Sequence, residues 1–149
     1  MFLQLKHVTV THTKDLRVLI DDFSFTLGPG DKIAIIGEEG NGKSTLLRLM
    51  AGQVPPYCEI SGEIVRRGRF AYLPQEIDDA EKEQSVYAFF SSEEGFFDFP
   101  PAESAQLAAS LGLPSDEMYS DRPLGSYSGG EQVKFYLLRL LLSRPDVLL

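Results

Sequence analysis

The most constraining feature of the sequence is a glycine-rich octapeptide at residues 37–44, Gly-Glu-Glu-Gly-Asn-Gly-Lys-Ser. It follows a short apolar run, residues 32–36, which we expect to form a buried parallel strand. It precedes a segment with helical apolar spacing that ends at Gly52. A strand, a loop of the pattern G-x-x-x-x-G-K-[ST] and a helix form a phosphate-binding loop. The sequence therefore predicts an α/β fold built around a loop that holds a polyphosphate.

Each residue type in this loop has a physical role. The glycines let backbone N–H groups face the phosphates, and the helix that follows directs its positive end at them. We expect Lys43 to place its ammonium on the terminal phosphates, and Ser44 to offer its hydroxyl to Mg²⁺. Because Glu38 and Glu39 would repel a triphosphate, we expect both side chains to point into solvent. The predicted nucleotide-binding residues are Gly37, Gly40, Asn41, Gly42, Lys43, Ser44 and Thr45.

Length and composition exclude several classes of protein. The 149 residues suffice for one domain of ordinary size, and the 43% hydrophobic content is that of a globular protein. The single cysteine, Cys58, excludes an internal disulfide framework and a cysteine-based zinc site. No apolar run is long enough to span a membrane, and the N-terminus lacks the pattern of a signal peptide. We therefore expect a cytoplasmic protein.

The net charge of -8 is concentrated in one segment, because nine carboxylates and a single lysine lie between Glu76 and Ser104. We interpret this segment as a solvated helical face. Nucleic-acid backbones attract basic surfaces, so we expect no direct DNA binding.

Local patterns predict strands in the first half of the chain and helices in the second. The predicted elements are strands over residues 2–10, 17–27 and 32–36, a helix over 44–51, a hairpin of 62–65 with 69–73 turning at Arg67-Gly68, a helix over 86–90 capped by Ser85, a helix from Pro101 to Leu111, a helix over 131–143, and a strand beginning at 147.

Two further motifs stand at fixed distances from the phosphate loop. Tyr72-Leu73-Pro74-Gln75 lies 32 residues after Lys43, and Tyr127-Ser128-Gly129-Gly130-Glu131 lies 53 residues after Gln75. With the phosphate loop, this order resembles the ATP-binding-cassette (ABC) ATPases over essentially the whole chain. The resemblance implies an ABC-type P-loop NTPase, with a mixed sheet around the P-loop helix and a helical subdomain. It divides the chain into a nucleotide-binding core with an antiparallel β part (1–75), a helical subdomain (76–127), and a signature helix with the start of the Walker B strand (128–149).

The resemblance also implies residue roles. Gln75 would join Ser44 as a ligand of Mg²⁺ and act with Lys43 in catalysis. The signature residues Ser128, Gly129, Gly130 and Glu131 would cap the γ-phosphate of ATP bound on an opposing domain, since two glycines let a helix N-terminus approach an anion closely. A complete site therefore needs a second ABC domain, either in a homodimer or as the second cassette of a longer parent.

Within this family the sequence looks most like the soluble ABC-F proteins that act on ribosomes. The resemblance rests on the Tyr-Leu-Pro-Gln-Glu form of the glutamine motif and on residues 128–131 and 140–149, which read as a signature helix running toward Walker B. Two alternatives stay open: the ATP-binding subunit of a membrane transporter, and a non-hydrolysing nucleotide-binding module. The expected partners are ATP, a second ABC domain, and either the ribosome or a membrane-transporter subunit.

The sequence departs from the family pattern in three places. Tyr127 stands where leucine is usual. The adenine-stacking aromatic falls near His12 or Thr13, neither of which is Tyr or Phe, so the choice between ATP and GTP stays open; we interpret His12 as a surface residue at a strand end. The sequence stops at Leu149, before the Walker B aspartate and catalytic glutamate. We expect a truncated fold whose parent is an ATPase, while residues 1–149 alone hydrolyse ATP negligibly.

Overall fold

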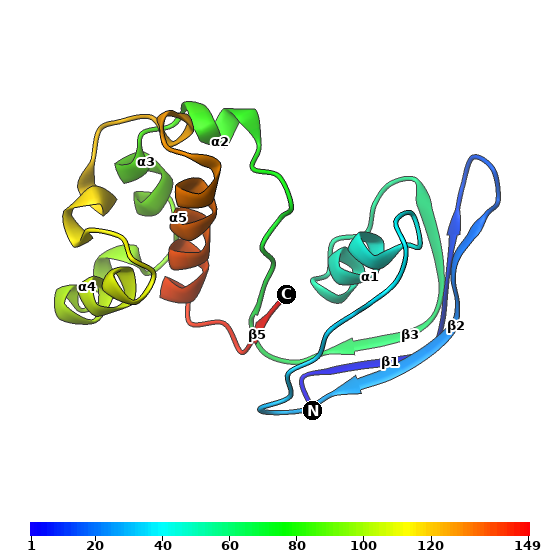
Figure 1. Cartoon of the computed structure of the whole chain (residues 1–149). Helices are drawn as coiled ribbons and strands as arrows, with labels where there is room; N and C mark the ends of the chain where they lie inside the picture. The colour runs from blue at the N-terminus through cyan, green and yellow to red at the C-terminus, as the bar shows by residue number, and fades with distance from the viewer. The chain divides into compact units, whose positions relative to one another are not determined.

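The computed structural model describes all residues from 1 to 149, and the chain divides into two compact units. The first unit consists of Met1–Tyr72 and Asp146–Leu149, and the second of Leu73–Pro145. Figure 1 shows that the first unit is built from strands and one helix, whereas the second unit is helical.

A three-stranded antiparallel sheet forms the body of the first unit, in the order β2-β1-β3. Central strand β1 carries four side chains that are almost completely buried, Leu3, Leu5, Val8 and Val10. The strands predicted over residues 2–10 and 17–27 are confirmed. The sheet consists of β1 (Leu3–His12), β2 (Val18–Leu27) and β3 (Cys58–Arg66).

A bulge at His7 explains why four residues of β1 share one face. Buried side chains change from odd to even positions between Leu5 and Val8, where both ladders shift register. His7 has a φ of 50° at this shift, which inserts an extra residue and returns the apolar side chains to the same face. Gly62 of β3 lies opposite with a φ of 96°, and a Cβ there would be 2.3 Å from the His7 carbonyl oxygen.

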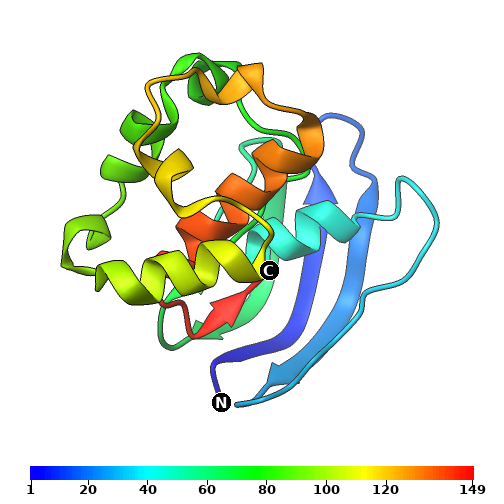
Figure 2. The ribbon, with the colours of Figure 1, turned by 60° about the vertical axis from the view of Figure 1, so that its left-hand side comes forward.

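Helix α1 (Lys43–Met50) covers this apolar face of the sheet, as Figure 2 shows. Leu46, Leu49 and Met50 are buried in one cluster with the β1 residues. At the end of the helix, the Arg66 guanidinium donates hydrogen bonds to the Met50 carbonyl (2.9 Å) and to the Leu49 carbonyl. The helix predicted over residues 44–51 is confirmed.

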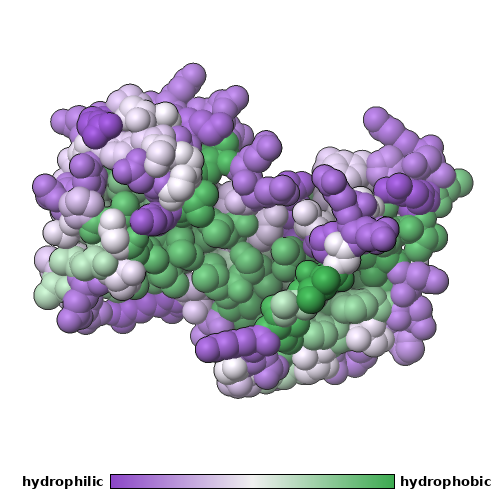
Figure 3. Space-filling model, in the orientation of Figure 1, coloured by the Kyte–Doolittle hydropathy of each residue, from purple (hydrophilic) through white to green (hydrophobic).

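The predicted parallel strand at residues 32–36 is wrong. These residues have no regular secondary structure, and Ile36 is 92% exposed. A parallel strand forms only when neighbours pair with it, and no strand of the structure pairs with this segment. Its isoleucines instead border a cavity of about 700 Å³, which Leu148 and Leu149 also line. The first unit therefore presents apolar surface to solvent, which contributes to the green area in Figure 3.

The hairpin predicted to turn at Arg67-Gly68 is also wrong. Strand β3 pairs with β1, whereas β4 (Phe70–Ala71) pairs in parallel with β5 (Val147–Leu148). Asp146 accounts for the change of partner, because its carboxylate accepts a hydrogen bond from the Arg69 amide (2.7 Å) and its own amide donates to the Arg69 carbonyl (2.9 Å). These contacts hold the distant β5 beside β4, and the strand predicted from residue 147 is confirmed.

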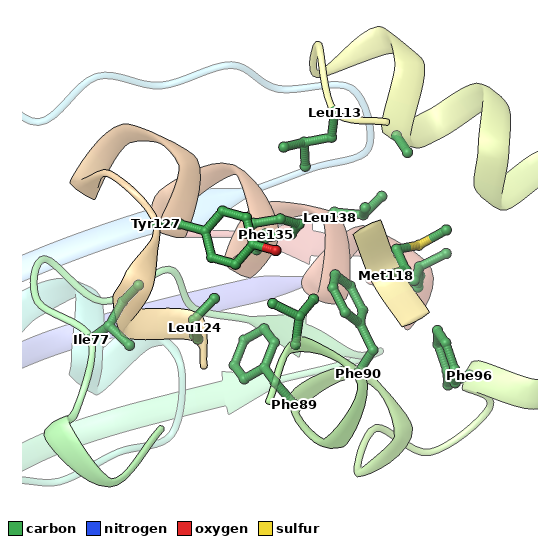
Figure 4. Packing of buried hydrophobic residues seen from close by; sticks show 13 residues of the cluster. Ile77, Phe89, Phe90, Phe96, Leu113, Met118, Leu124, Tyr127, Phe135 and Leu138 are labelled. Carbon is green, nitrogen blue, oxygen red and sulfur yellow. The ribbon is translucent and has the colours of Figure 1, made fainter. Parts of the chain in front are cut away.

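The second unit packs its helices around a core rich in aromatic side chains, and Phe89, Phe90 and Phe135 are fully buried there (Figure 4). Two predicted helix starts are confirmed: Ser85 accepts a hydrogen bond from the Ala88 amide (3.1 Å), and Pro101 occupies the first turn of its helix. The elements are α2 (Asp79–Glu83), α3 (Val86–Ser91), α4 (Pro101–Ser110) and α5 (Gly129–Leu142), with 3₁₀ turns η1 (Phe96–Asp98), η2 (Ser115–Tyr119) and η3 (Leu124–Ser126).

The acidic segment is not a uniformly solvated face. Arg139 of α5 lies with its guanidinium 4.4 Å from the centre of the Phe89 ring, and it pairs with Glu93 (3.0 Å) and Glu81 (3.6 Å). The two carboxylate side chains are only 25% and 26% exposed. Two of the acidic residues therefore fasten the segment to α5. No helix in the structure combines the length and the hydropathy needed to cross a bilayer.

The bulge predicts an unequal response to two glycine substitutions. Gly62 and Gly30 both have positive φ, but only Gly62 faces backbone atoms at short range. We expect Gly30→Ala to lower the free energy of unfolding by about 1–2 kcal/mol through the strained φ alone. Gly62→Ala should lower it considerably more, because the new methyl group collides with the His7 carbonyl. Urea denaturation followed by tyrosine fluorescence measures both, and equal losses would contradict this account of the bulge.

Candidate nucleotide-binding site

The start of α1 presents unpaired backbone donors. The first hydrogen bond of the helix runs from the Leu46 amide to the Gly42 carbonyl (2.8 Å). The amides of Lys43, Ser44 and Thr45 therefore have no acceptor within the helix. No acidic residue lies in the first turn, and no side chain caps it. The positive end of the helix is thus available to an anion.

The glycine-rich loop folds around the Lys43 side chain. Its ammonium donates hydrogen bonds to the carbonyls of Gly37 (2.7 Å) and Glu38. Gly42 has a φ of 75°, and a Cβ there would lie 3.2 Å from the Leu19 carbonyl oxygen, so this position requires glycine. Of the predicted loop residues, the structure thus brings Gly37 into contact with the Lys43 ammonium.

The remaining loop positions are open to solvent. Gly40, with a φ of 83°, and Asn41 are exposed, and a Cβ at Gly40 would meet no atom within 4 Å. The side chains of Glu38 and Glu39 are exposed, as predicted. The loop therefore keeps its carboxylates in water, while its lysine and the free amides of the following helix are the groups that could bind an anion.

The residues predicted to hold Mg²⁺ fit this ion only in part. Ser44 is exposed in the first turn of α1, and its hydroxyl is a hard oxygen ligand of the kind that Mg²⁺ prefers. Gln75 is exposed in the segment between β4 and α2, but it belongs to the second unit. Its role as a second ligand therefore stays a prediction. The structure contains no group of three or more His, Cys, Asp or Glu side chains that could hold a metal ion.

His12, the last residue of β1, lies in a small aromatic cluster. Its ring centre is 5.6 Å from that of Tyr57, and the two planes are tilted by 43°. The His12 Nδ1 atom lies 2.8 Å from the Asp15 carboxylate, and the side chain is only 27% exposed. His12 is thus more confined than the surface residue that we expected. Tyr57 was not singled out from the sequence, because a lone aromatic in a turn carries no periodic signal.

The signature residues form the N-terminus of α5. The Ser128 hydroxyl and amide both donate to Glu131 Oε2, at 2.7 and 2.9 Å, and the Glu131 amide donates to the Ser128 hydroxyl oxygen (3.3 Å). This reciprocal arrangement is a capping box. Gly129 and Gly130 are exposed, and a Cβ at either position would meet no neighbouring atom within 4 Å.

The capping box also shifts the pKa of the Glu131 carboxyl. Hydrogen bonds from the Ser128 hydroxyl and amide lower the pKa of this carboxyl, and the positive charges of Arg122 and Lys134 lower it further. Glu131 therefore stays ionised to lower pH than an ordinary glutamate, and it keeps a negative charge in the first turn of the signature helix.

Tyr127 adopts a defined role in place of the usual leucine. Its ring is buried, and it meets Phe135 edge-on at 4.9 Å between centroids (Figure 4). The Tyr127 hydroxyl donates a hydrogen bond to Glu117, and burial raises the pKa of this tyrosine. The Arg122 guanidinium lies 4.2 Å from the ring centre. Arg122 was not predicted from the sequence, because the loop that contains it has no periodic pattern that would indicate its contacts.

Residues 20–149 match the ABC transporter family. The chain belongs to this family. It is 36% identical over 137 residues to the zinc import ATP-binding protein ZnuC of Yersinia pestis bv. Antiqua (strain Antiqua), which covers 89% of this chain and 50% of the relative. It is 30% identical over 187 residues to the tylosin resistance ATP-binding protein TlrC of Streptomyces fradiae, which covers 98% of this chain and 34% of the relative. The chain thus spans about half the length of the zinc import relatives, and less of TlrC.

Solved structures support the same fold. A cobalt transport ATP-binding protein superposes with a TM-score of 0.71 at 23% identity, over 98% of this chain and 57% of that one. A metal-chelate type ABC transporter in an inward-facing conformation superposes with a TM-score of 0.69 at 23% identity, over 99% of this chain and 59% of that one. The predicted fold class, a P-loop NTPase of the ABC type, is confirmed.

The capping box predicts a pH-dependent contribution to stability. Because folding lowers the pKa of Glu131, its contribution is fully present above the unfolded pKa of about 4.3 and is lost as the pH falls through the lower folded pKa. Glu131→Gln should therefore destabilise the chain at pH 7, and the difference from the parent should shrink between pH 5 and pH 3. Thermal unfolding followed by circular dichroism measures the difference. Glu94→Gln, at an exposed position of the same unit, serves as the control, and a difference that grows on acidification would refute the assignment.

Proposed function

We propose that this chain is the nucleotide-binding part of an ABC-type ATPase that powers a membrane transporter, and that its phosphate loop binds MgATP. The observation that carries the proposal is the open start of α1, where three amides have no acceptor within the helix and Lys43 follows the glycine-rich loop. Membership of the ABC transporter family and the similarity to zinc import ATP-binding proteins support the transporter role. Such a subunit works at the cytoplasmic side of the membrane.

The residues of the loop would act by exchanging partners. In the structure, Lys43 binds the carbonyls of Gly37 and Glu38. On nucleotide binding, we expect the ammonium to turn to the terminal phosphates, while the amides of residues 43–45 bind phosphate oxygens. Ser44 would hold Mg²⁺, which neutralises phosphate charge when bound, and Gln75 is the proposed second ligand. The amides at the start of α1 would thus be in place before the ligand arrives, whereas the Lys43 ammonium would change partners.

The signature helix would serve a partner. Gly129 and Gly130 have accessible amides, and the capping box leaves these two donors unused. We propose that α5 of one copy, or of one cassette, faces the phosphate loop of another. Each nucleotide would then lie between a loop from one domain and a signature from the other, and association would require nucleotide.

A ribosome-associated, ABC-F-like role is the second candidate. It rests on the Tyr-Leu-Pro-Gln-Glu form of the glutamine motif at residues 72–76. The two roles differ in what the longer protein carrying this chain binds. Retention with detergent-solubilised membrane subunits after affinity purification favours the transporter role, whereas ATP-dependent co-sedimentation with ribosomes through sucrose favours the second.

Lys43→Ala should weaken nucleotide binding by about tenfold to a hundredfold, because a charge-assisted contact to phosphate contributes about 1.5–3 kcal/mol. Ser128→Arg is the matched control, since it should leave binding by the single chain unchanged while blocking closure on a partner. Equilibrium dialysis with ATP and Mg²⁺ measures both constants. The assignment of roles fails if Ser128→Arg abolishes binding, or if Lys43→Ala leaves it unchanged.

A further inference from the structure

Arg122 is held at a fixed place beside the signature. Its carbonyl accepts a hydrogen bond from the Val86 amide (2.9 Å), which ties its backbone to the start of α3. Its guanidinium lies 4.2 Å from the centre of the Tyr127 ring. Tyr127 immediately precedes Ser128, so this cation lies close to the N-terminus of α5.

The ring beneath Arg122 is a rigid support. Tyr127 is only 8% exposed, and its ring packs edge-on against Phe135. Its hydroxyl donates a hydrogen bond to Glu117, and its oxygen lies 3.3 Å from the Ser120 hydroxyl oxygen. Because its neighbours hold this ring in place, the guanidinium that stacks on it is held near the start of α5. The leucine usual at this position has no aromatic face and would give no such support.

The signature helix needs a cation to receive a phosphate. Glu131 places a negative charge in its first turn, directly on the Ser128 hydroxyl and amide. A phosphate that approaches Gly129 and Gly130 meets this carboxylate, and like charges repel at such distances. Arg122 is close enough to act electrostatically on Glu131, as Lys134 of α5 also does. The two cations offset the carboxylate, and Arg122 is the one that an aromatic ring holds in place.

We infer that Arg122, stacked on Tyr127, is a second phosphate-binding group of the signature and contacts the terminal phosphate of a nucleotide bound by a partner copy. The inference rests on the proposed head-to-tail function. Arginine suits this place, because its planar guanidinium stacks through one face and donates paired hydrogen bonds to phosphate oxygens from its edge. A purely structural Arg122 would act only on its own chain, whereas a phosphate-binding Arg122 acts on the partner's nucleotide.

The test separates these roles by placing one complete site in a mixed pair of full-length chains. One chain carries Lys43→Ala and contributes only a signature, and the other carries Ser128→Arg and contributes only a phosphate loop. Fluorescence resonance energy transfer between labels on the two chains reports their association as a non-hydrolysable ATP analogue with Mg²⁺ is added. Arg122→Gln is then introduced into either chain.

We expect Arg122→Gln in the signature-donating chain to raise the half-maximal analogue concentration about tenfold, the effect of losing one charged hydrogen bond. The same substitution in the loop-donating chain should have no effect. An unchanged signature donor, or equal effects in both chains, would overturn the inference. If the reference pair itself fails to associate, the head-to-tail proposal falls and this inference falls with it, whereas nucleotide binding by the single chain is judged separately by dialysis.

Three further variants distinguish the loss of a phosphate contact from misfolding of the chain that carries Arg122→Gln. Tyr127→Phe retains the ring and should behave as the parent, whereas Tyr127→Leu retains burial but removes the stacking face and should weaken association as Arg122→Gln does. Arg144→Gln is the matched control, because Arg144 also lies over a ring, 4.8 Å from that of Phe99, and pairs with Glu103 (2.9 Å). If Arg144→Gln weakens association as much as Arg122→Gln, or if Tyr127→Leu does not weaken it, Arg122 does not act as inferred.

Discussion

The contact between α1 and β1 supports everything that the phosphate loop does. Leu46, Leu49 and Met50 lie in one buried cluster with four residues of β1, and burial of each such side chain contributes about 1.5–3 kcal/mol. This packing fixes the axis of α1 and therefore the direction of its free amides. The contact depends in turn on the bulge at His7, since a regular β1 would turn Val8 and Val10 away from the helix. A backbone irregularity in the sheet is thus a condition for an ordered anion site.

The N-termini of α1 and α5, which carry the phosphate loop and the signature, differ in whether a side chain caps them. The start of α1 has a left-handed glycine as its cap and no side-chain acceptor, so its amides have no partner of their own. The start of α5 has a complete capping box, which uses the Glu131 amide and the Ser128 hydroxyl. An uncapped helix end binds an anion directly, whereas a capped one presents only its two glycine amides. This difference matches a primary phosphate site on one helix and an auxiliary contact on the other.

Features that depend on residues close together in the sequence could be predicted, whereas features that depend on distant residues could not. The helix starts at Ser85 and Pro101 were predictable, because caps and first-turn prolines act over a few residues. The phosphate loop was predictable because the spacing of its glycines, lysine and serine determines the conformation of its backbone. Residues 32–36 and 69–73 were predicted wrongly, since the partner of a strand is chosen by distant residues such as Asp146. The stack of Arg122 on Tyr127 lies in an irregular loop, where spacing does not reveal contacts.

The capping box at Ser128 has a consequence for any encounter between two copies. The serine hydroxyl carries one hydrogen, and in the isolated chain that hydrogen is directed at Glu131. Before the hydroxyl can donate to a foreign oxygen, it has to rotate and leave the carboxylate with one contact fewer. Only a strongly anionic ligand compensates for the loss of that hydrogen bond. In the isolated chain the Ser128 hydroxyl is therefore already engaged within its own helix, and any external acceptor has to compete with Glu131 for its hydrogen.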